Sequence, residues 1–306
     1  MPESRAKPFL KWAGGKSQLL NAFVTYYPAE LAHGSITNYF EPFLGAGAVF
    51  FYLAQKYRFK SAFLSDVNEE LIVVFKVVQE QVEPLIEELD RFSRGFFKLD
   101  PPARKARFYE IREQYNSNRR RVSFKQFRRY WILRAAQFIF LNKTCYNGLF
   151  RVNRDGLFNV PFGRYRNPCI VDADNLRNAS RALGIAEITV ADFEAIGSST
   201  QEDAFIYYDP PYKPISRTAR FTSYSRHNFD DHQQVRLAEF FKEMDRKGVK
   251  QMLSNSDPRN VDPDDGFFDE LYAPFNIYRI PANRAINSDA RKRGNINELV
   301  ITNYPK

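Results

Sequence analysis

The feature that most restricts the fold is a strand, a glycine-rich turn, a helix and a second strand in close succession. The run "TNYFEPF", residues 37–43, predicts a strand, and "LGAGA" predicts a tight turn before an apolar helix that begins at Val49. "SAFLSD", residues 61–66, predicts the second strand, and residues 69–81 are periodic enough for another helix. Strands that are joined through a helix lie parallel in one sheet.

The second half of the chain repeats this alternation. We expect strands at 187–190, 204–208, 251–253 and 299–302, and a helix over 231–247. Strands that alternate with helices predict an α/β fold with a doubly wound, Rossmann-like sheet.

A different composition separates the two halves. From about residue 77 to residue 166 the chain is aromatic, helical in pattern and strongly basic, as in "RRRVSFKQFRRYWILRAAQF". We predict that residues 77–166 form an inserted, mostly helical domain, and that 1–76 and 167–306 form the main domain. Asp155 and Gly156, between two short extended runs, predict a β-hairpin within the insertion.

The predicted hairpin is rich in arginine. Its cationic side chains are Arg151, Arg154, Arg164 and Arg166. A β-ribbon of this kind can enter the major groove of DNA or lie along its phosphates. The alternative is an ordinary hairpin beside a solvated basic helix.

The overall charge agrees with a nucleic-acid partner. The chain has 45 Lys and Arg against 36 Asp and Glu, a net charge of +9, and 16% aromatic residues. Basic charge with many aromatics suits binding to nucleic acid. A modest positive excess can also serve only to solvate a surface. The motifs must therefore decide whether the chain binds nucleic acid.

The cysteine, histidine and hydropathy patterns argue against a metal site, a membrane span and a signal peptide. Cys145, Cys169 and the three histidines lack the spacing of metal ligands, so we predict no bound metal and a reducing compartment. No apolar run approaches the roughly 20 residues that span a membrane. The first residues also lack the apolar core of a signal peptide. We therefore expect a cytoplasmic protein without a membrane partner.

Two glycine motifs indicate the kind of nucleotide that could bind. "WAGGKS", residues 12–17, resembles the end of a phosphate-binding loop, but Leu10 stands where that motif requires its first glycine. "FLGAGA" lacks the last glycine of a dinucleotide fingerprint, although Asp66 follows about 20 residues later, where an acid accepts from ribose hydroxyls. This combination favours an adenosine ligand without a pyrophosphate.

Charged side chains near these turns suit a cationic ligand. Glu41 and Asp66, at the ends of two predicted strands, put negative charge on one rim of the sheet. S-adenosylmethionine fits because its ribose needs acceptors, its sulfonium is positive, and its carboxylate needs one cation, for which Lys16 is available. Each of these residues alone is more often a turn or capping residue.

A further motif follows the predicted strand at 204–208. In "IYYDPPYKP", residues 206–214, two prolines come directly after Asp209 and end the strand there, because proline cannot donate to a sheet. The resulting turn is stiff and has acceptors but almost no donors. For an isolated motif, the alternative is an ordinary proline turn with a capping Asp.

Several segments together resemble one family, the Dam-like DNA adenine methyltransferases that modify the 6-amino group. In the family's order, these segments are "FLKWAGGK", "YFEPFLGAGAVF", "LSDVNEEL", "YNGLFRVN", "FNVPFGRY", "YYDPPYKPIS", "FTSY" and "LSNSD". They span nearly the whole chain. "NRAINSDARKRG", residues 283–294, departs from the arginine-rich run that the family has there.

The resemblance implies a role for individual residues. It implies that S-adenosylmethionine is contacted by Trp12, Lys16, Asp66 and Asp209. The residues that complete its pocket are then Glu41, Phe43, Gly45, Gly47, Asp192 and Phe193. It also implies contacts with double-stranded DNA, in which Tyr146 inserts into the base stack and Arg164 contacts a phosphate. The residues that read bases are then Lys11, Leu149, Arg151 and Pro161, and Asn147 and Tyr165 bind DNA beside them. The implied target is GATC. The main domain is then the catalytic methyltransferase domain, and the insertion is the target-recognition domain.

The acceptor-rich turn suits the activation of a poor nucleophile. The lone pair of adenine's amino group is delocalised into the ring, and two acceptors on its N–H groups would release it. The Asp209 carboxylate and the Pro210 carbonyl can accept these bonds, while Pro211 adds no backbone donor and Tyr212 offers a face for stacking. A fixed carboxylate also stabilises the positive charge that develops on nitrogen during transfer. We predict these four residues as catalytic.

The base must first rotate out of the duplex. This step costs a few kcal/mol, and one stacking contact returns roughly 1–3 kcal/mol. Further binding is expected from phosphate contacts of the insertion, and from Phe221, Tyr224 and Phe229 closing over the base. The alternative for these three rings is an ordinary place in the core.

Other functions stay open on sequence grounds. A cytosine-amine methyltransferase would prefer Ser in place of Asp209, and a catalytically idle DNA-binding regulator would not require this acid. An RNA adenine methyltransferase is disfavoured by the hairpin, because A-form RNA hides its major groove. We expect no obligate protein partner, although a cognate restriction endonuclease can act on the same site.

Overall fold

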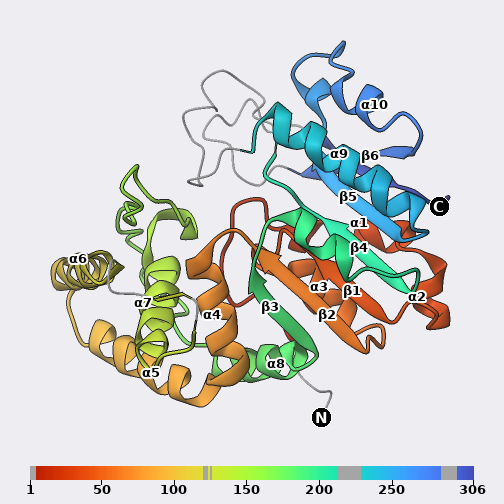
Figure 1. Ribbon diagram of the computed structural model, residues 1–306. Helices are drawn as coiled ribbons and strands as arrows, with labels where there is room; N and C mark the ends of the chain where they lie inside the picture. The colour runs from red at the N-terminus through yellow and green to blue at the C-terminus, as the bar shows by residue number, and fades with distance from the viewer. Residues whose placement is uncertain (1–4, 120–122, 125, 213–228, 284–294) are drawn as a thin grey trace.

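The computed structural model describes residues 5–119, 123–124, 126–212, 229–283 and 295–306. In this part of the chain, seven strands form one sheet in the order β3-β2-β1-β4-β5-β7-β6 (Figure 1). The strands are β1 (Asn38–Glu41), β2 (Ser61–Asp66), β3 (Ala186–Val190), β4 (Ala204–Tyr208), β5 (Lys250–Ser256), β6 (Asn276–Asn283) and β7 (Asn295–Thr302). The five strands from β3 to β5 in this order are parallel, and β7 is antiparallel to both of its neighbours.

The predicted α/β fold with a Rossmann-like sheet is confirmed. The strands predicted at 61–66 and 204–208 have these bounds in the structure, and β5 and β7 extend beyond their predicted cores. The sequence analysis missed β6, which contains Pro281 and pairs only with β7 at one edge of the sheet. Proline is tolerated in edge strands, so this strand lacks the pattern of a central one.

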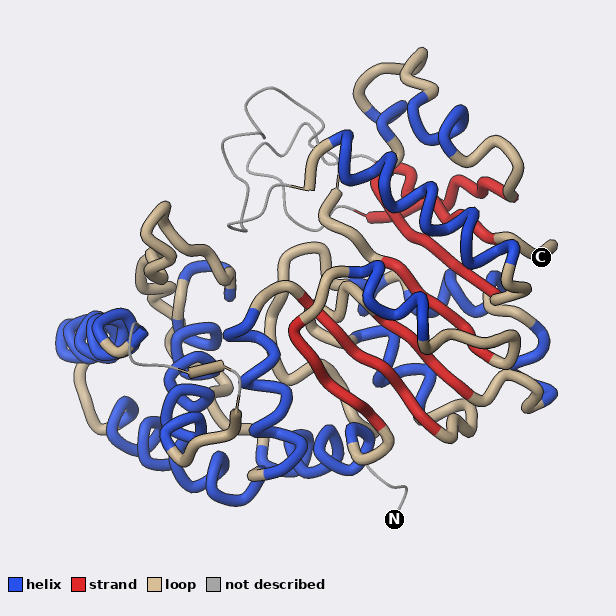
Figure 2. The backbone as a smooth tube through the Cα atoms, in the orientation of Figure 1, coloured by secondary structure: helices blue, strands red, loops and turns tan. Residues whose placement is uncertain are grey.

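Helices cover the sheet on both faces (Figure 2). The α-helices of the described residues are α1 (Leu20–Phe23), α2 (Ala29–His33), α3 (Ala48–Ala54), α4 (Glu69–Glu80), α5 (Val82–Phe97), α6 (Pro101–Ser117), α7 (Tyr130–Thr144), α8 (Ala173–Leu183), α9 (Asp231–Arg246) and α10 (Phe267–Leu271), of which α5, α6 and α7 lie beside the sheet. Asn68 begins α4 by accepting from the backbone N–H groups of Glu70 and Leu71, and Asp230 begins α9 in the same way. Such side-chain acceptors satisfy N–H groups that the first helical turn leaves unpaired.

The central strand β4 shows how the two faces are filled. Phe205 and Tyr207 pack in the core cluster that includes α3 and α4, whereas Ile206 and Tyr208 pack in the cluster that includes α9 and α10. Successive side chains of a strand point to opposite faces. Since both faces are covered, every residue of β4 is buried, which explains its continuous apolar run.

The insertion is helical, as predicted, and lies beside α4 at one end of the sheet (Figure 1). Rings of Phe92 and Phe96 in α5 pack on Phe140 in α7, each with centroids 5.6 Å apart. Residues of α5, α6 and α7 share one core cluster with β1 and β2. Helix α4 continues through residue 76, where the sequence analysis placed a domain boundary, so the division into two domains stays a prediction.

The predicted hairpin forms only as a short reversal of the chain. Gly156 has the positive φ of 77° that the turn requires, and the Asn153 N–H donates to the Leu157 carbonyl across it at 2.9 Å. The two arms meet in one antiparallel bridge, between Val152 and Phe158. The arms are therefore held by contacts with helices rather than by a long ladder of their own.

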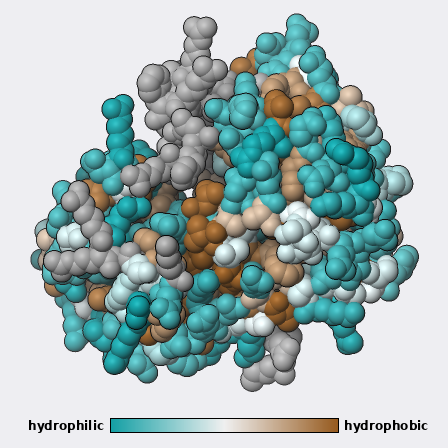
Figure 3. Space-filling model, viewed as in Figure 1, coloured by the Kyte–Doolittle hydropathy of each residue, from teal (hydrophilic) through white to brown (hydrophobic). Residues whose placement is uncertain are grey.

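The space-filling view shows how polar and apolar side chains are distributed on one face of the molecule (Figure 3). Hydrophilic side chains cover most of it, and apolar side chains come together near its middle, between the insertion and the sheet (Figure 3). No helix among the described residues is long and apolar enough to cross a membrane.

A buried ion pair joins the insertion to α4. Arg134 of α7 donates from Nε to Glu70 Oε2 at 2.7 Å and from a terminal nitrogen to the Tyr115 carbonyl of α6 at 2.9 Å. The two charged side chains are only 4% and 7% exposed. Because a buried charge is costly without its partner, this pair fixes three helices relative to one another.

We predict that Arg134→Ala lowers the free energy of unfolding by about 3–5 kcal/mol, because the Glu70 carboxylate loses its buried partner. Urea denaturation measures this change. Glu70→Leu combined with Arg134→Met should restore most of the loss. Arg177→Ala removes the exposed pair between Arg177 and Glu83 and is the control, with little expected change in midpoint. Equal effects of the two arginine substitutions would contradict the prediction.

Candidate active site

The carboxyl ends of the parallel strands bring most of the predicted cofactor residues to one edge of the sheet. Glu41 ends β1, Asp66 ends β2, and Asp209 directly follows β4. Strand β1 pairs with both β2 and β4, so these three ends are neighbours. Asp192 follows β3, the next strand beyond β2. In open α/β sheets, this edge is where ligands bind.

The glycine turn after β1 is shaped by Asp66 and Trp12. The Gly45 N–H donates to Asp66 Oδ2 at 3.1 Å, while the other carboxylate oxygen accepts from the Asn68 N–H at 2.9 Å. Gly45 has a φ of 48°, and a Cβ there would lie 3.1 Å from the Trp12 ring. Gly47 also has a positive φ, of 68°, where it begins α3. Both glycines are therefore needed for the turn, and Gly45 also allows the close approach of Trp12.

Glu41 is buried rather than displayed on the rim. Its Oε2 accepts from the Phe50 N–H at 3.1 Å and from the Tyr39 hydroxyl at 2.8 Å, and the residue is 2% exposed. Burial raises the pKa of Glu41 to about 8. The protonated form is thus favoured at neutral pH, and Glu41 adds less negative charge to this edge than the sequence analysis expected.

Lys16 lies at the centre of the charged groups. Its Nζ is 2.6 Å from Asp209 Oδ1 and 3.9 Å from Glu298 Oε2, and it also contacts the Tyr212 hydroxyl. The same Nζ lies 4.3 Å from the centroid of the Tyr212 ring. The Lys16 side chain is only 3% exposed, so these partners compensate an ammonium group that is almost fully removed from water.

The surroundings of Asp209 favour a carboxyl group that can take up a proton. Removal from water raises the pKa of Asp209, and the Lys16 ammonium opposes this shift without reversing it. Ser254 of β5 lies 3.3 Å from Asp209 Oδ1 and 2.7 Å from the Tyr207 hydroxyl. Asp209 is therefore oriented from two sides, by Lys16 and by Ser254.

Two residues that support the turn after β4 were missed by the sequence analysis. Glu298 of β7 accepts a hydrogen bond of 2.5 Å from the Tyr212 hydroxyl. Gln234 of α9 is buried, donates to the Pro211 carbonyl at 3.2 Å, and accepts from Asn255. Both residues are distant in sequence from the turn, so only the packing of β7 and α9 reveals them.

The Pro210 carbonyl is the second acceptor that the sequence analysis predicted. Pro210 is buried, and no donor in the described part of the chain is paired with its carbonyl oxygen. The Pro211 carbonyl, by contrast, is paired with Gln234. The turn thus keeps one fixed acceptor beside the Asp209 carboxylate.

Aromatic rings form the side of the site near β3. The rings of Phe43 and Phe193 stack with centroids 5.6 Å apart, and Phe229 lies edge-on to Phe43 at 5.4 Å. Asp192 is engaged by Arg236, whose Nε also donates to Glu194 at 2.8 Å. Phe229 therefore packs against the predicted cofactor rings, while Phe221 and Tyr224 lie outside the described residues.

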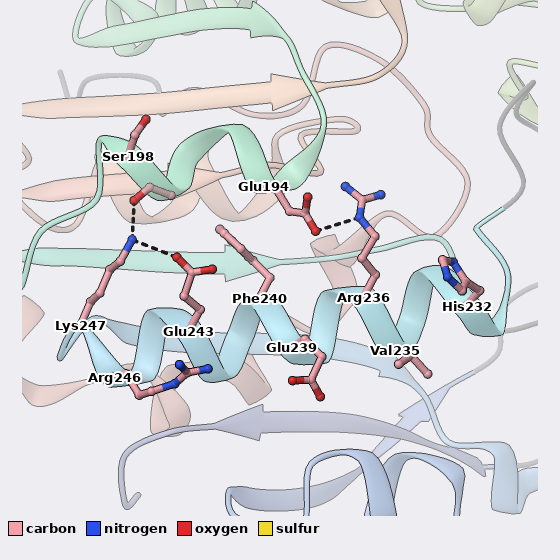
Figure 4. Close-up of a pocket in the computed structure, with 11 residues that line it drawn as sticks. Glu194, Ser198, His232, Val235, Arg236, Glu239, Phe240, Glu243, Arg246 and Lys247 are labelled. Atoms are coloured by element: carbon pink, nitrogen blue, oxygen red, sulfur yellow. Dashed lines mark hydrogen bonds and ion pairs between the residues drawn. The ribbon is translucent and has the colours of Figure 1, made fainter.

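A surface groove of about 800 Å³ lies on the outer side of this region, between α9 and the 3₁₀ helix at Phe193–Ser198 (Figure 4). Two ion pairs lie within it, between Arg236 and Glu194 and between Lys247 and Glu243. The residues that line it include none of the predicted site residues. The groove borders the candidate active site through Arg236, which pairs with Asp192 and lies over the Phe193 ring.

The predicted DNA-binding residues gather around the end of α7. Tyr146 is 55% exposed, and its backbone N–H donates to the Pro161 carbonyl at 2.8 Å. Asn147 and Arg164 have φ values of 54° and 56°, which are uncommon for residues other than glycine. The Lys11 Nζ lies 4.6 Å from the centroid of the Tyr165 ring. The structure thus brings Lys11, from the start of the chain, to the predicted recognition segments.

Two further residues that were predicted to read bases make contacts within the protein. Arg151 donates from Nε to Asn159 Oδ1 at 2.8 Å, within the hairpin. Leu149 is half-buried and packs on the main core cluster. Backbone strain at Asn147 and Arg164, in the same region, is of the kind that is concentrated at functional sites.

Known proteins resemble this chain over almost its full length. Residues 12–286 match the family described as D12 class N6 adenine-specific DNA methyltransferase, and the chain belongs to this family. The fold, the edge of the sheet and the family thus define a DNA adenine methyltransferase, which the sequence analysis predicted. The family implies a methyl donor as the second substrate.

Particular relatives agree with this class. A protein named type II methyltransferase M.MjaIII, from Methanocaldococcus jannaschii, is 49% identical over 97% of this chain and 99% of its own length. Type II methyltransferase M1.LlaDCHI of Lactococcus lactis subsp. cremoris is 37% identical over 97% and 95% of the two chains. The DNA adenine methylase of Escherichia coli strain K12 is 30% identical over 100% and 97%.

We predict that Glu41→Gln changes the pH dependence of stability. The ordinary pKa of 4.5 rises to about 8 on folding, so between these values folding takes up a proton and the wild-type protein loses stability as the pH rises. Glutamine does not titrate and can still accept from Phe50 and Tyr39. The difference in Tm, variant minus wild type, should therefore increase from pH 5 to pH 8 in thermal scans.

The exposed Glu83 provides the control for this experiment. Its pKa is lowered by the hydrogen bond from Arg177, so it is ionised throughout this pH range. The Tm difference for Glu83→Gln should stay nearly constant. The same constancy for Glu41→Gln would show that the Glu41 carboxyl is not protonated on folding.

Proposed function

We propose that this enzyme transfers the methyl group of S-adenosylmethionine to the 6-amino group of an adenine that has rotated out of duplex DNA, within the sequence GATC. The observation that carries the proposal is the pair of fixed oxygen acceptors, Asp209 and Pro210, at the end of β4. Strand β4 pairs with β1, which ends at Glu41, and β1 pairs in turn with β2, which ends at Asp66.

The residues at this edge fit S-adenosylmethionine. Asp66 has both oxygens fixed by backbone N–H groups and retains lone pairs for ribose hydroxyls. Gly45 leaves space that a Cβ would fill, and the rings of Phe43 and Phe193 offer apolar surface for a purine. Lys16 is the buried cation that a carboxylate requires. When bound, this cofactor supplies a methyl group on a positively charged sulfur.

Asp209 and Pro210 would act on the amino group of adenine. A carboxylate has lone-pair sites for about four hydrogen bonds, so Asp209 can accept from Lys16, Ser254 and the amine together. The Pro210 carbonyl takes the second N–H. Because both acceptors are fixed before the reaction, they stabilise the charge that grows on nitrogen without reorganisation. The raised pKa of Asp209 also suits it to accept the proton that the methylated nitrogen releases.

Tyr212 would stack on the rotated base. Its hydroxyl donates to Glu298 at 2.5 Å and contacts Lys16, so the ring is held before a base arrives. One stacking contact contributes roughly 1–3 kcal/mol, which offsets part of the few kcal/mol needed to rotate a base out of the duplex. The rest would come from contacts of the insertion with phosphates.

The segments around Lys11 and Tyr146 would read the bases. GATC is proposed because "YNGLFRVN" and "FNVPFGRY" resemble the subgroup with that target. The relatives named as DNA adenine methylases support a DNA substrate, and the type II methyltransferases support a partner restriction endonuclease with the same target. A cytoplasmic location is part of the same proposal.

We predict that Asp209→Ala reduces methyl transfer by at least about a hundredfold while cofactor binding is largely retained, since one preorganised electrostatic contact is worth that much. Incorporation of labelled methyl groups into duplex DNA and equilibrium binding of the cofactor measure the two effects. Asp209→Asn, which keeps the size of the side chain next to Lys16, is the companion variant. Near-normal transfer by both variants would refute the proposed mechanism.

The proposed target has a direct test. A library of duplexes is methylated by the wild-type enzyme, and the modified adenines are mapped. We expect methylation at the adenine of GATC. Another uniform sequence around the mapped adenines would refute GATC and leave the mechanism intact, whereas absence of methylated adenine would refute the activity itself.

A further inference from the structure

The strongest unassigned feature is a buried amide at the junction of the segments that are proposed to read DNA. Asn142, in the last turn of α7, is 1% exposed. Its Oδ1 accepts from the Lys11 N–H at 2.9 Å, and its Nδ2 donates to the Lys11 carbonyl at 2.9 Å. The same Nδ2 donates to the Gly148 carbonyl at 2.8 Å. One side chain thus holds two segments that are far apart in the sequence.

These three bonds determine where Lys11 lies. A residue whose N–H and carbonyl are both held cannot rotate freely about its backbone, so the direction in which its side chain leaves is fixed. The Lys11 side chain is exposed and runs along Gly148, where a Cβ would lie only 2.3 Å from Lys11 Cδ. It ends over the ring of Tyr165. The backbone is therefore rigid while the cationic end faces outward.

Two other asparagines hold single residues in the same way and provide a comparison. Asn175 of α8 accepts from the Lys7 N–H at 2.8 Å and donates to the Lys7 carbonyl at 3.0 Å. Asn116 of α6 makes the equivalent pair with Phe158, at 2.8 and 3.0 Å. Within the described part of the chain, neither of these amides is bonded to a second segment of the predicted DNA-binding set. Among the three, only Asn142 adds the bond that joins Lys11 to the loop at Gly148.

We propose that Asn142 is a specificity-determining positioning residue. It holds Lys11 in register with the loop of Tyr146 to Leu149, so that the two base-contacting segments fit one DNA sequence together. Since it is buried behind both segments, Asn142 acts through them and does not touch the DNA. This inference rests on the proposed function, in which Lys11 and the loop contact bases.

The test compares two isosteric substitutions, Asn142→Asp and Asn175→Asp. In each variant the carboxylate can still accept from the backbone N–H, but it cannot donate to the carbonyl groups. The values of kcat/KM are measured on a duplex with the preferred site and on duplexes that differ from it by one base pair. Cofactor binding and Tm are measured in parallel, because a purely structural role would change only stability.

We expect Asn142→Asp to reduce the ratio of kcat/KM between the preferred site and its best single variant by about tenfold or more, on the scale of one lost base discrimination. Asn175→Asp should lower Tm to a similar extent and leave this ratio unchanged. If both variants keep the wild-type ratio, or both lose it equally, the proposal is overturned.

A second variant covers the case in which Asn142→Asp does not fold. Gly148→Ala displaces the Lys11 side chain from the loop, and it also strains the backbone there, because Gly148 has a φ of 63° and its carbonyl accepts from Asn142. It should reduce the same discrimination ratio, and an unchanged ratio would overturn the proposal.

Lys11→Ala separates this inference from the proposed function on which it rests. Loss of discrimination in Lys11→Ala, together with full discrimination in Asn142→Asp, would refute only the role of Asn142. Full discrimination in Lys11→Ala would instead refute base reading by Lys11.

Discussion

The ion pair between Lys16 and Asp209 is the interaction on which the candidate active site depends. A nearly buried ammonium group needs a close anion, and Asp209 provides it at 2.6 Å. The pair ties the N-terminal segment, with Trp12 and Lys16, to the end of β4. The same ammonium contacts Tyr212 and lies near Glu298. The acid that is proposed to act on adenine therefore also holds together the groups that surround it.

The oxygen acceptors at the edge of the sheet and the segments proposed to read DNA are held in place in different ways. At the edge of the sheet, parallel strands place Glu41, Asp66 and Asp209 side by side, and buried groups such as Gln234 support the turn that follows. In the described residues, the segments proposed to read DNA have only isolated bridges, so helical asparagines such as Asn142 provide the backbone hydrogen bonds that a ladder would supply. Irregular segments thus become rigid without becoming strands.

Much of the fold could be predicted because its signals are local. The strands β2 and β4 were predicted to the residue, since apolar runs that end in a turn mark buried parallel strands. The gathering of Glu41, Asp66 and Asp209 at one edge followed from the same reasoning, because strand ends of a parallel sheet must lie together. The edge strand β6 and the support from Glu298 could not be found this way, because their positions depend on pairing between distant segments. The buried state of Glu41 was likewise invisible in its motif.

The sequence by itself determined the α/β class, the stiff turn at Asp209 and the family to which the motifs belong, because each depends on neighbouring residues whose backbone preferences are local. Only the tertiary structure determined which charged side chains contact one another. It placed Lys16 against Asp209, raised the pKa of Glu41 by burial, and joined Lys11 to the loop at Gly148 through Asn142. Electrostatic energy and hydrogen bonding depend on distance and on exclusion of water, and both are set by packing between segments far apart in the chain.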